Sequence, residues 1–376
     1  MNIGILYTSA LHQAGGIGRY TRGLVGALAQ LDDPGTTRYE LVVARDAPLD
    51  RLPMLPPRFR VRRLPFSERQ MTILWHRFDL PLWVDAWCGP FDVFHAPDFV
   101  LPPLRRAPGL VTVHDLSFLT YPSGAVPGLR RWLKRVVPAS IRRARHVLAD
   151  SESTRRDIVR HLAVDAAKVS VVGAGVDRRF RPITDPGALG DVRRRYRLPD
   201  RFVLGLGTLE PRKNFEGLIG AFDRIQAEFP ELHLVIAGGR GWLYDPILAA
   251  AAVSPAADRI HVVGFVADED LPALYSLART FAFPSHYEGF GLPVLEAMSC
   301  GTPVLASDNS SLPEVAGDAA ILVPASDVPA LADALARLER DTSLRAACRR
   351  RGIARAAGYT WEAAARRLSA VYRRFG

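Results

Sequence analysis

The sequence predicts an α/β protein made of two Rossmann-like domains, each with a parallel sheet. Short apolar runs alternate with helical patterns of ten or more residues along the chain, which is typical of parallel sheets. These runs form two sets, separated by residues 173–187, which are rich in proline, glycine and charge. The 376 residues also suit two domains of roughly 150 residues each. We therefore expect two doubly wound sheets that face each other across a cleft.

The first set opens with the apolar run 1–7, then a glycine-bearing loop and a helical pattern at 19–31, where apolar residues recur every three to four positions. Strand, loop and helix in this order form the first unit of a doubly wound sheet. Further buried strands are predicted at 39–44, 91–97, 109–116 and 145–153. All of them end in polar residues.

The second set opens with a strand at 201–210 and a helix at 215–229. Further strands are predicted at 232–239, 259–266, 280–285 and 302–308. We place the domain boundary between Asp177 and Asp185. Ligands of such sheets bind at the carboxyl ends of the strands, so candidate site residues are sought there.

Composition indicates an ordinary globular protein, with 48% hydrophobic and 23% charged residues. Three scattered cysteines form neither a disulfide framework nor a zinc spacing and suit a reducing compartment. The first residues lack the features of a signal peptide, and no apolar run is long enough to span a membrane. We expect a cytoplasmic protein.

The formal net charge of +10 is compatible with nucleic acid, an anionic membrane or a phosphorylated ligand. Residues 129–146 carry seven lysines and arginines and no acid, interleaved with apolar residues. This segment either binds an anionic membrane surface from the cytoplasmic side as an amphipathic helix or is a solvated helix face. The sequence leaves both interpretations open.

The most informative stretch is SHYEGFGLPVLEAMSCG, residues 285–301, which follows a predicted strand. Gly289 and Gly291 are poor helix residues, and Pro293 is tolerated only in the first turn of a helix. We therefore predict a loop that becomes a helix near Leu292.

Glu288 then lies in the loop and Glu296 within the first turns of the helix. Backbone N–H groups at the start of a helix favour an anion such as a phosphate. Two carboxylates beside a phosphate suit sugar hydroxyls, so we expect a pocket for a phosphorylated sugar. The alternative is an ordinary strand-to-helix turn with two solvated glutamates.

This stretch resembles the EX7E motif of retaining glycosyltransferases with the GT-B fold, particularly glycosyltransferase family 4. The resemblance extends to 207–214, 262–285, 303–323 and 359–375, and in the first half to 14–24, 114–118 and 149–158. It implies an acceptor-binding domain at 1–180 and a nucleotide-sugar-binding domain at 181–358. The helix at 359–376 would pack back on the N-terminal domain.

The family motif implies a role for each matching residue. Glu288 would accept hydrogen bonds from the transferred sugar, and Glu296 would hold the ribose diol. Arg212 and Lys213 would neutralise the diphosphate, whose leaving group gains negative charge in the transition state. Some relatives carry a further basic residue near Thr208, and its absence here leaves this task mainly to the other two cations.

Other donor contacts are implied for Gly16, Gly264, Phe265, Val266, Gly289, Phe290, Gly291 and Leu292. Gly16 would approach the phosphate from the N-terminal domain, and residues 264–266 would hold the base by backbone contacts. His114 would touch the donor sugar near the reacting carbon. Gly15, His95 and Asp115 are candidates on the acceptor side.

The implied activity is transfer of a hexose from a nucleotide diphosphate sugar to a hydroxyl of a glycan or lipid-linked acceptor. Residues 207–222 and 114–122 are most similar to bacterial mannosyl- and rhamnosyltransferases of surface polysaccharide synthesis, so GDP-mannose is the first donor considered. The family implies retention of configuration, which a front-face route would explain. Residues 63–87, rich in aromatics, are the predicted acceptor surface.

No metal and no cofactor are expected. Residues 268–270 look like a metal-binding DXD but directly precede a helical pattern, so we interpret them as a helix N-cap. Residues 205–207 begin like a dinucleotide fingerprint, but its third glycine is missing. A nucleotide-sugar epimerase and a basic nucleic-acid-binding protein are the alternatives, and the acidic, glycine-rich motifs favour neither.

Overall fold

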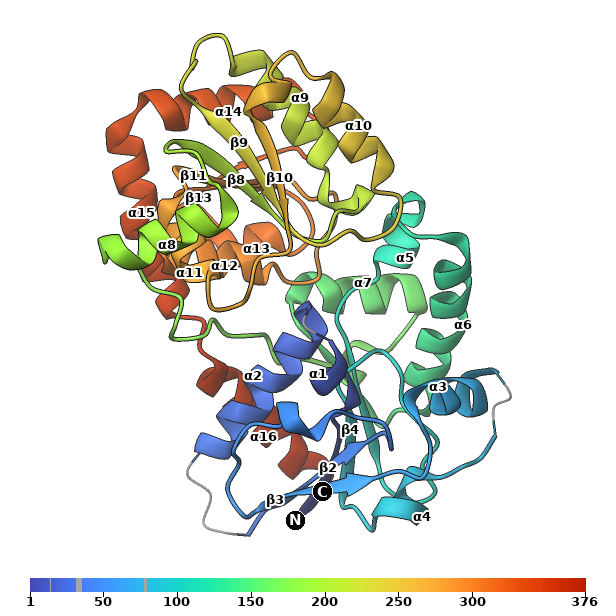
Figure 1. The fold of residues 1–376 in the computed structure, drawn as a ribbon. Coiled ribbons are helices and arrows are strands. Elements are labelled where there is room, and N and C mark those ends of the chain that lie inside the picture. Colours follow the sequence, from blue (N-terminus) through green and yellow to red (C-terminus); the bar gives the residue numbers. More distant parts are fainter. Residues whose placement is uncertain (14, 32–35, 78–79) are drawn as a thin grey trace. The chain divides into compact units, whose positions relative to one another are not determined.

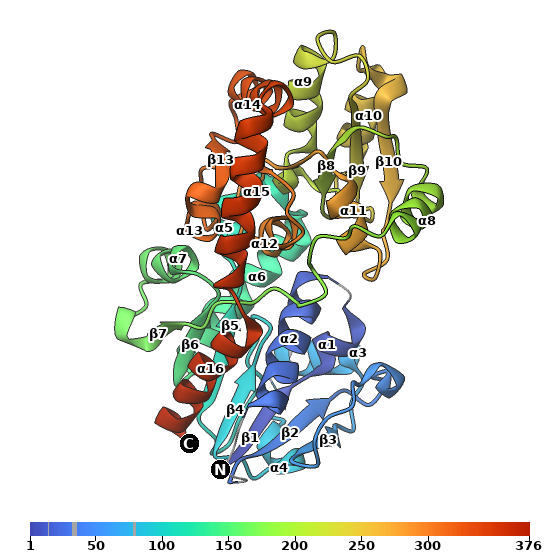
Figure 2. The same ribbon diagram turned by 90° about the vertical axis from the view of Figure 1, so that its left-hand side faces the viewer.

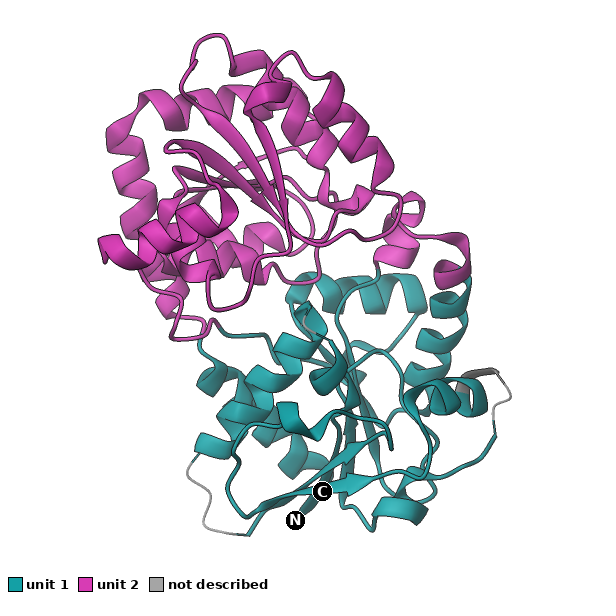
Figure 3. Cartoon of the chain, in the orientation of Figure 1, with its two compact units in different colours: residues 1–116, 131–175, 360–376 teal, residues 117–130, 176–359 magenta. Residues whose placement is uncertain are grey.

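The computed structural model describes residues 1–13, 15–31, 36–77 and 80–376. Ala14 and residues 78–79, which belong to stretches discussed above, lie outside the described residues. The chain divides into two compact units (Figure 3), each an α/β layer structure with one parallel sheet (Figure 1). Unit 1 comprises residues 1–116, 131–175 and 360–376, and unit 2 comprises residues 117–130 and 176–359. The predicted fold class is confirmed.

Unit 1 contains a seven-stranded sheet in the order β3-β2-β1-β4-β5-β6-β7, with every neighbouring pair parallel. Its strands are β1 Asn2–Leu6, β2 Arg38–Val43, β3 Phe59–Arg63, β4 Val93–Ala96, β5 Gly109–Val113, β6 His146–Ala149 and β7 Val169–Val171. The sequence did not predict β3 and β7. Both are edge strands, and their partial exposure breaks the apolar run that marks a central strand.

The helices of unit 1 are α1 Thr8–His12, α2 Gly16–Gln30, α3 Glu68–Met71, α4 Val84–Cys88, α7 Glu152–Leu162 and α16 Trp361–Phe375, with most of α6 Pro127–Arg143. The C-terminal helix α16 packs against α2 (Figure 2). A Cβ at Gly23 of α2 would lie 2.4 Å from the Trp361 ring, so only glycine allows this close approach. The helix predicted at 19–31 begins three residues earlier in the structure, at Gly16.

Unit 2 contains a six-stranded parallel sheet in the order β10-β9-β8-β11-β12-β13. Its strands are β8 Phe202–Leu206, β9 His233–Ala237, β10 Ile260–Gly264, β11 Thr280–Phe283, β12 Val304–Ser307 and β13 Ala320–Val323. Its helices are α5 Ser117–Thr120, α8 Pro186–Tyr196, α9 Phe215–Ile225, α10 Asp245–Val253, α11 Leu271–Leu277, α12 Leu292–Ser299, α13 Leu312–Ala316, α14 Val328–Arg340 and α15 Thr342–Ala357.

The core of unit 2 forms where α9 and α14 pack together over the sheet. Phe222, Leu218 and Leu335 are fully buried there, as the 3.6-residue apolar period of both helices requires. The partly exposed edge strand β13 was not predicted. All the other strands of unit 2 were predicted from the sequence.

Residues 117–130 pack within unit 2, although the predicted bounds place them in the N-terminal domain. The Tyr121 ring stacks on His286 with 4.9 Å between ring centroids. The Trp242 Nε1 group donates to the Gly124 carbonyl oxygen at 2.6 Å. These aromatic contacts depend on distant residues, which explains why composition along the chain could not predict them.

Candidate active site

The loop before α12 has the predicted form. α12 begins at Leu292, with Pro293 in its first turn. Gly291 has a φ of +104°, and a Cβ there would lie 2.7 Å from Leu312 Cδ2. The positive φ favours glycine at this position. The helix start at Leu292 confirms the loop-to-helix prediction.

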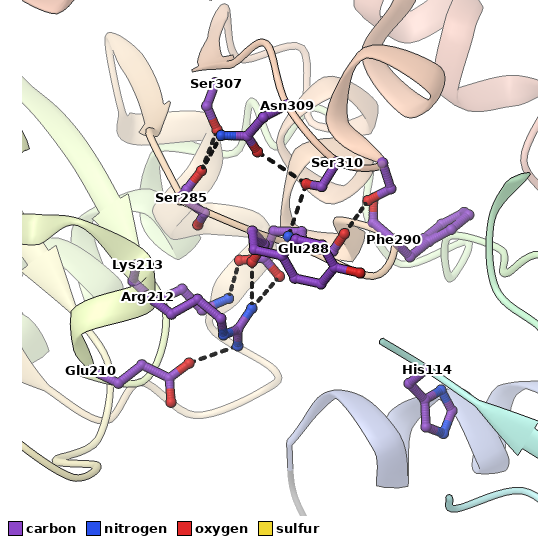
Figure 4. A network of polar contacts seen from close by, with 12 residues as sticks. His114, Glu210, Arg212, Lys213, Ser285, Glu288, Phe290, Ser307, Asn309 and Ser310 are labelled. Atoms are coloured by element: carbon purple, nitrogen blue, oxygen red, sulfur yellow. Dashed lines mark hydrogen bonds and ion pairs between the residues drawn. The ribbon is translucent and has the colours of Figure 1, made fainter. Parts of the chain in front are cut away.

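Glu288 lies in this loop and is held by two cations (Figure 4). Its Oε1 accepts from Lys213 Nζ at 2.6 Å, and its Oε2 lies 2.9 Å from Arg212 Nη1. Arg212 Nη2 also donates to Glu210 Oε1 at 2.6 Å. Three predicted residues are thereby brought together, and Glu210, whose pairing was not predicted, completes a network of two cations and two carboxylates.

Burial and charge act in opposite directions on this network. Burial alone would raise the pKa of Glu288, but Arg212 and Lys213 outweigh it and lower that pKa to about 2. Burial lowers the pKa of Lys213, and the neighbouring Arg212 lowers it further. Glu288 is therefore ionised at neutral pH and can act only as a hydrogen-bond acceptor.

The cation-bearing loop is fixed by Asn214, which caps α9 from a left-handed backbone conformation (φ 56°). Its side chain accepts from the Gly217 N–H and donates to the carbonyl oxygens of Pro284 (3.1 Å) and Ala325 (2.7 Å). This amide thus joins the loop after β8 to the end of β11. It places Arg212 and Lys213 beside the Glu288 loop.

The Glu288 loop is also fixed from the β12 side. Ser310 Oγ accepts from the Glu288 N–H at 2.9 Å, and Ser311 Oγ lies 2.9 Å from the carbonyl oxygens of Glu288 and Phe290 (Figure 4). The Phe290 ring meets Tyr359 edge-on. The loops after β8 and β12 therefore hold this backbone, which supports a binding surface rather than a solvated turn.

Glu296 lies in α12 and is 1% exposed. Its Oε2 accepts from the Tyr275 hydroxyl at 3.0 Å. Neither Glu288 nor Glu296 is solvated, so the alternative of two solvated glutamates is wrong. The two carboxylates have different partners and do not form an acid–base pair.

The segment predicted to hold the nucleotide base follows β10. Gly264 has a φ of +77°, and its carbonyl oxygen accepts from the Gly238 N–H at 2.7 Å. Phe265 is 65% exposed, whereas Val266 is buried. An exposed aromatic ring at the carboxyl edge of the sheet is available to stack on a planar ligand.

In unit 1, Gly15 occupies the N-cap of α2 and Gly16 its first position. No described heavy atom lies within 4 Å of a Cβ built on either. Gly18 differs, because its Cβ would lie 1.9 Å from the Gln13 carbonyl oxygen. The first two glycines are thus exposed at a helix N-terminus, while the third is required by packing.

His114 lies just beyond β5 and is buried, with Asp115 beside it in a half-buried position. Its Nδ1 lies 2.7 Å from Asp150 Oδ2, and its Nε2 lies 2.9 Å from the Pro97 carbonyl oxygen. Burial disfavours the charged ring, yet Asp150 outweighs it and raises the pKa of His114 to about 9. At neutral pH His114 is an imidazolium, which can donate hydrogen bonds but cannot act as a base.

His95 requires a correction. Its Nδ1 lies 2.8 Å from the Tyr372 hydroxyl and its Nε2 lies 2.8 Å from Thr112 Oγ1. It is 1% exposed, and burial lowers its pKa to about 3. Because both nitrogens are used inside unit 1, His95 joins α16 to the sheet and is not an acceptor ligand.

Residues 268–270 also differ from the prediction. Asp270 stands at the N-cap position of α11, but its carboxylate does not cap the helix. It accepts instead from Arg195 Nη1 at 2.6 Å and from the Tyr196 hydroxyl at 2.7 Å. A charged partner on α8 outcompetes the helix N–H groups for this carboxylate.

The described residues include no cluster of three or more histidine, cysteine, aspartate or glutamate side chains that could hold a metal ion. None of their helices is both long and apolar enough to cross a bilayer. The basic segment 129–146 falls mostly on α6, where Arg131, Lys134, Arg135 and Arg142 are exposed.

Sequence reasoning missed the partner of each main site residue: Glu210 for Arg212, Tyr275 for Glu296, and Asp150 for His114. Glu210 and Asp150 both lie within predicted strand segments, near their carboxyl ends, which is the signal that could have found them. Tyr275 lies within a helix and gives no such signal.

Comparison with known proteins finds similar sequences along most of the chain. The family model described as glycosyl transferases group 1 matches residues 193–355, and the model described as glycosyltransferase family 4 matches residues 14–180. The O-antigen chain mannosyltransferase B of Escherichia coli is 36% identical over 273 residues, covering 72% of this chain and 71% of that protein. A GDP-mannose-dependent alpha-(1-6)-phosphatidylinositol monomannoside mannosyltransferase of Mycobacterium tuberculosis is 35% identical over 192 residues, about half of each chain.

Solved structures agree on the fold. A sucrose-phosphate synthase from Thermosynechococcus elongatus matches with a TM-score of 0.77 at 23% identity, covering 100% of this chain and 98% of that one. The Anabaena protein HepE, in complex with UDP and glucose, matches with a TM-score of 0.77 at 19% identity, covering 99% of each. The chain therefore belongs to glycosyltransferase family 4, and it is a glycosyltransferase with the GT-B fold.

Proposed function

We propose that this enzyme transfers a hexose from a nucleoside diphosphate sugar to a hydroxyl of a glycan or lipid-linked acceptor. Mannose from GDP-mannose is the first candidate, because relatives with 36% and 35% identity are named mannosyltransferases. The name of the Escherichia coli relative, O-antigen chain mannosyltransferase B, supports a polysaccharide acceptor. UDP-sugars are the next donors to test.

The observation that carries this proposal is the pair of partly buried cations that hold the buried Glu288. A departing nucleoside diphosphate gains negative charge in the transition state, which Arg212 and Lys213 would stabilise from a site of low polarity. Glu288 is ionised and can only accept hydrogen bonds, so it would orient the sugar hydroxyls beside these two cations. One site would thus bind both the phosphates and the sugar of the donor.

The remaining residues would have supporting roles. Glu296 would accept from the ribose diol, and residues 264–266 would hold the base, with Phe265 stacking on it. In unit 1, Gly16 would donate its backbone N–H to a phosphate. His114, as an imidazolium, would donate to the sugar once Nε2 exchanges the Pro97 carbonyl for a hydroxyl.

Retention of configuration and independence of metal are part of the proposal. Arg212 and Lys213 supply the positive charge that a divalent cation supplies in other transferases, so chelation of metals should leave the rate unchanged. A strict need for Mg²⁺ would contradict this. The anomeric configuration of the product, read by NMR, tests retention against inversion.

Donor identity is tested by thermal shift against a panel of nucleotide sugars. A ligand at a hundred times its Kd stabilises the folded protein by about 2.7 kcal/mol. The expected result is the largest shift with GDP-mannose, lost in Lys213→Met. A panel without any shift, together with no turnover, would contradict the proposal, and isomerised donor without acceptor would indicate an epimerase.

Peripheral contact with the inner face of the membrane is proposed for the basic segment 129–146. The exposed cations of α6 would attract anionic lipid head groups. Sedimentation with vesicles containing phosphatidylglycerol tests this. Binding that is unchanged in a variant with Arg131, Lys134 and Arg135 replaced by glutamine would contradict it.

A further inference from the structure

Unit 2 contains a cavity of about 200 Å³ at the edge of its sheet opposite to Glu288. It lies where β11 and β12 begin, whereas the candidate active site lies where they end. Its lining includes Ser276, Arg279, Thr302, Arg345 and Arg349, from the end of α11, the starts of both strands and the outer helix α15. No role in glycosyl transfer is assigned to any of these residues.

Positive charge exceeds negative charge around this cavity. Among the described residues, the lining of the cavity holds three arginines and no carboxylate. Behind it, the fully buried Glu339 is shared by two cations, because its Oε2 accepts from Arg201 at 3.0 Å and from Arg279 at 2.5 Å. Arg349 makes no hydrogen bond or ion pair with any described residue.

Arg345 shows that the cations repel one another. One of its Nη groups donates to the backbone carbonyls of Leu338 and Glu339 at the end of α14, which fixes the guanidinium in place. Burial lowers the pKa of Arg345, and the positive charge of Arg279 and Arg201 lowers it further, although the carboxylates of Glu339 and Asp341 oppose this. An anion in the cavity would relieve this repulsion.

The hydroxyl groups of the lining do not compete for that role. Ser276 Oγ donates to the Pro272 carbonyl, and Thr302 Oγ1 donates to the Tyr275 carbonyl. Their hydrogens are therefore used within the protein. Recognition of a ligand would fall to the guanidinium groups, whose planar N–H forks match phosphate oxygens.

We propose that this cavity is a second anion site, which binds the phosphate of a small soluble molecule such as pyrophosphate or a sugar phosphate. A phosphate dianion matches the surplus of guanidinium groups better than a single carboxylate does. The volume is sufficient for a diphosphate but small for a whole nucleotide sugar. The site is separate from the donor site and does not depend on the proposed donor.

The test is isothermal titration of the full chain with pyrophosphate in phosphate-free buffer. Arg349→Ala should weaken binding at this site about tenfold or more, the loss expected for one charge-assisted contact. Arg350→Ala is the matched control, because Arg350 is the next residue of α15, is exposed and lies outside the lining. It removes the same charge and should leave binding unchanged.

Pyrophosphate can also bind Lys213, so the wild type should show two classes of site. Lys213→Met should remove one class and Arg349→Ala should weaken the other, which separates failure of this proposal from failure of the proposed function. Equal isotherms for wild type and Arg349→Ala, or equal losses in Arg349→Ala and Arg350→Ala, would overturn the proposal. The proposal would also be overturned if the protein bound phosphatidylglycerol vesicles through Arg349 but did not bind pyrophosphate.

If Arg349→Ala does not fold, Arg349→Gln, which keeps the side-chain length, replaces it. The melting temperature decides between the two variants before titration. Retention of a second class of pyrophosphate site in Arg349→Gln would overturn the proposal, and its loss would support it.

Discussion

Truncation of Glu288 should destabilise the protein as well as stop transfer. In the structure, this carboxylate is the counter-ion of Lys213 and Arg212 in a largely buried network. Its removal would leave Lys213 without its strongest partner in a site of low polarity.

The size of the effect follows from the pKa of Glu288, which falls from its usual 4.5 to about 2. At about 1.4 kcal/mol per unit, this difference corresponds to roughly 3 kcal/mol of unfolding free energy at neutral pH. Breaking a buried ion pair from one side costs about 3–5 kcal/mol in general. Both routes predict a loss of about 3 kcal/mol.

The assay is chemical denaturation of wild type, Glu288→Gln, Lys213→Met and the double variant. The double variant should be more stable than Glu288→Gln alone, because it no longer buries the unpaired ammonium group. Since the pKa of Glu288 is depressed, its contribution is present above pH 4.5 and is lost as pH falls towards 2. The difference between wild type and Glu288→Gln should shrink over that range.

The control is Glu228→Gln, which removes an exposed glutamate paired with Arg340 in the same unit. Solvent screens such surface pairs, so this variant should unfold like the wild type. If Glu288→Gln is as stable as Glu228→Gln, or if the double variant is the least stable of the four, the described network is not what stabilises this loop.

Three other predictions concern other parts of the chain. Gly16→Ala should leave the melting temperature unchanged but lower the transfer rate. Gly18→Ala should lower the melting temperature, because only the Cβ at position 18 would collide with backbone atoms. Gly291→Ala should cost about 1–3 kcal/mol of unfolding free energy, since it places a side chain at a φ of +104°. The pKa of His114, raised to about 9, contributes stability below pH 6.5 that is lost as pH rises through 9. Thermal melts from pH 7 to 10 should show this fall, and Asp150→Asn should remove it.

The central strands and the loop before Leu292 could be predicted from the sequence because their causes are local. A buried parallel strand is a continuous apolar run, and a proline after two glycines marks a helix start. The edge strands β3 and β7 could not be predicted in this way, because their partial exposure mixes polar residues into the pattern. The edge strand β13 is wholly apolar but only four residues long, and it was missed.

The candidate site was predicted in its members but not in its pairings. Arg212, Lys213 and Glu288 were identified from their motifs, yet their contact depends on β8 lying beside β11 in the sheet. Strand order is set by tertiary packing and leaves no signal in either segment. For the same reason His95, at the end of a strand like His114, could not be recognised as a partner of Tyr372.

The placement of α16 in unit 1 has a consequence for how the protein is made. Most of unit 1 precedes unit 2 in the chain, but Tyr372 and Leu368 of the unit 1 core follow it. The strands and helices of unit 2 lie between these two parts of unit 1, and all of them are synthesised before α16. The half that begins first is therefore expected to finish last, and stalled nascent chains ending near residue 359 should resist protease in unit 2 but not in unit 1.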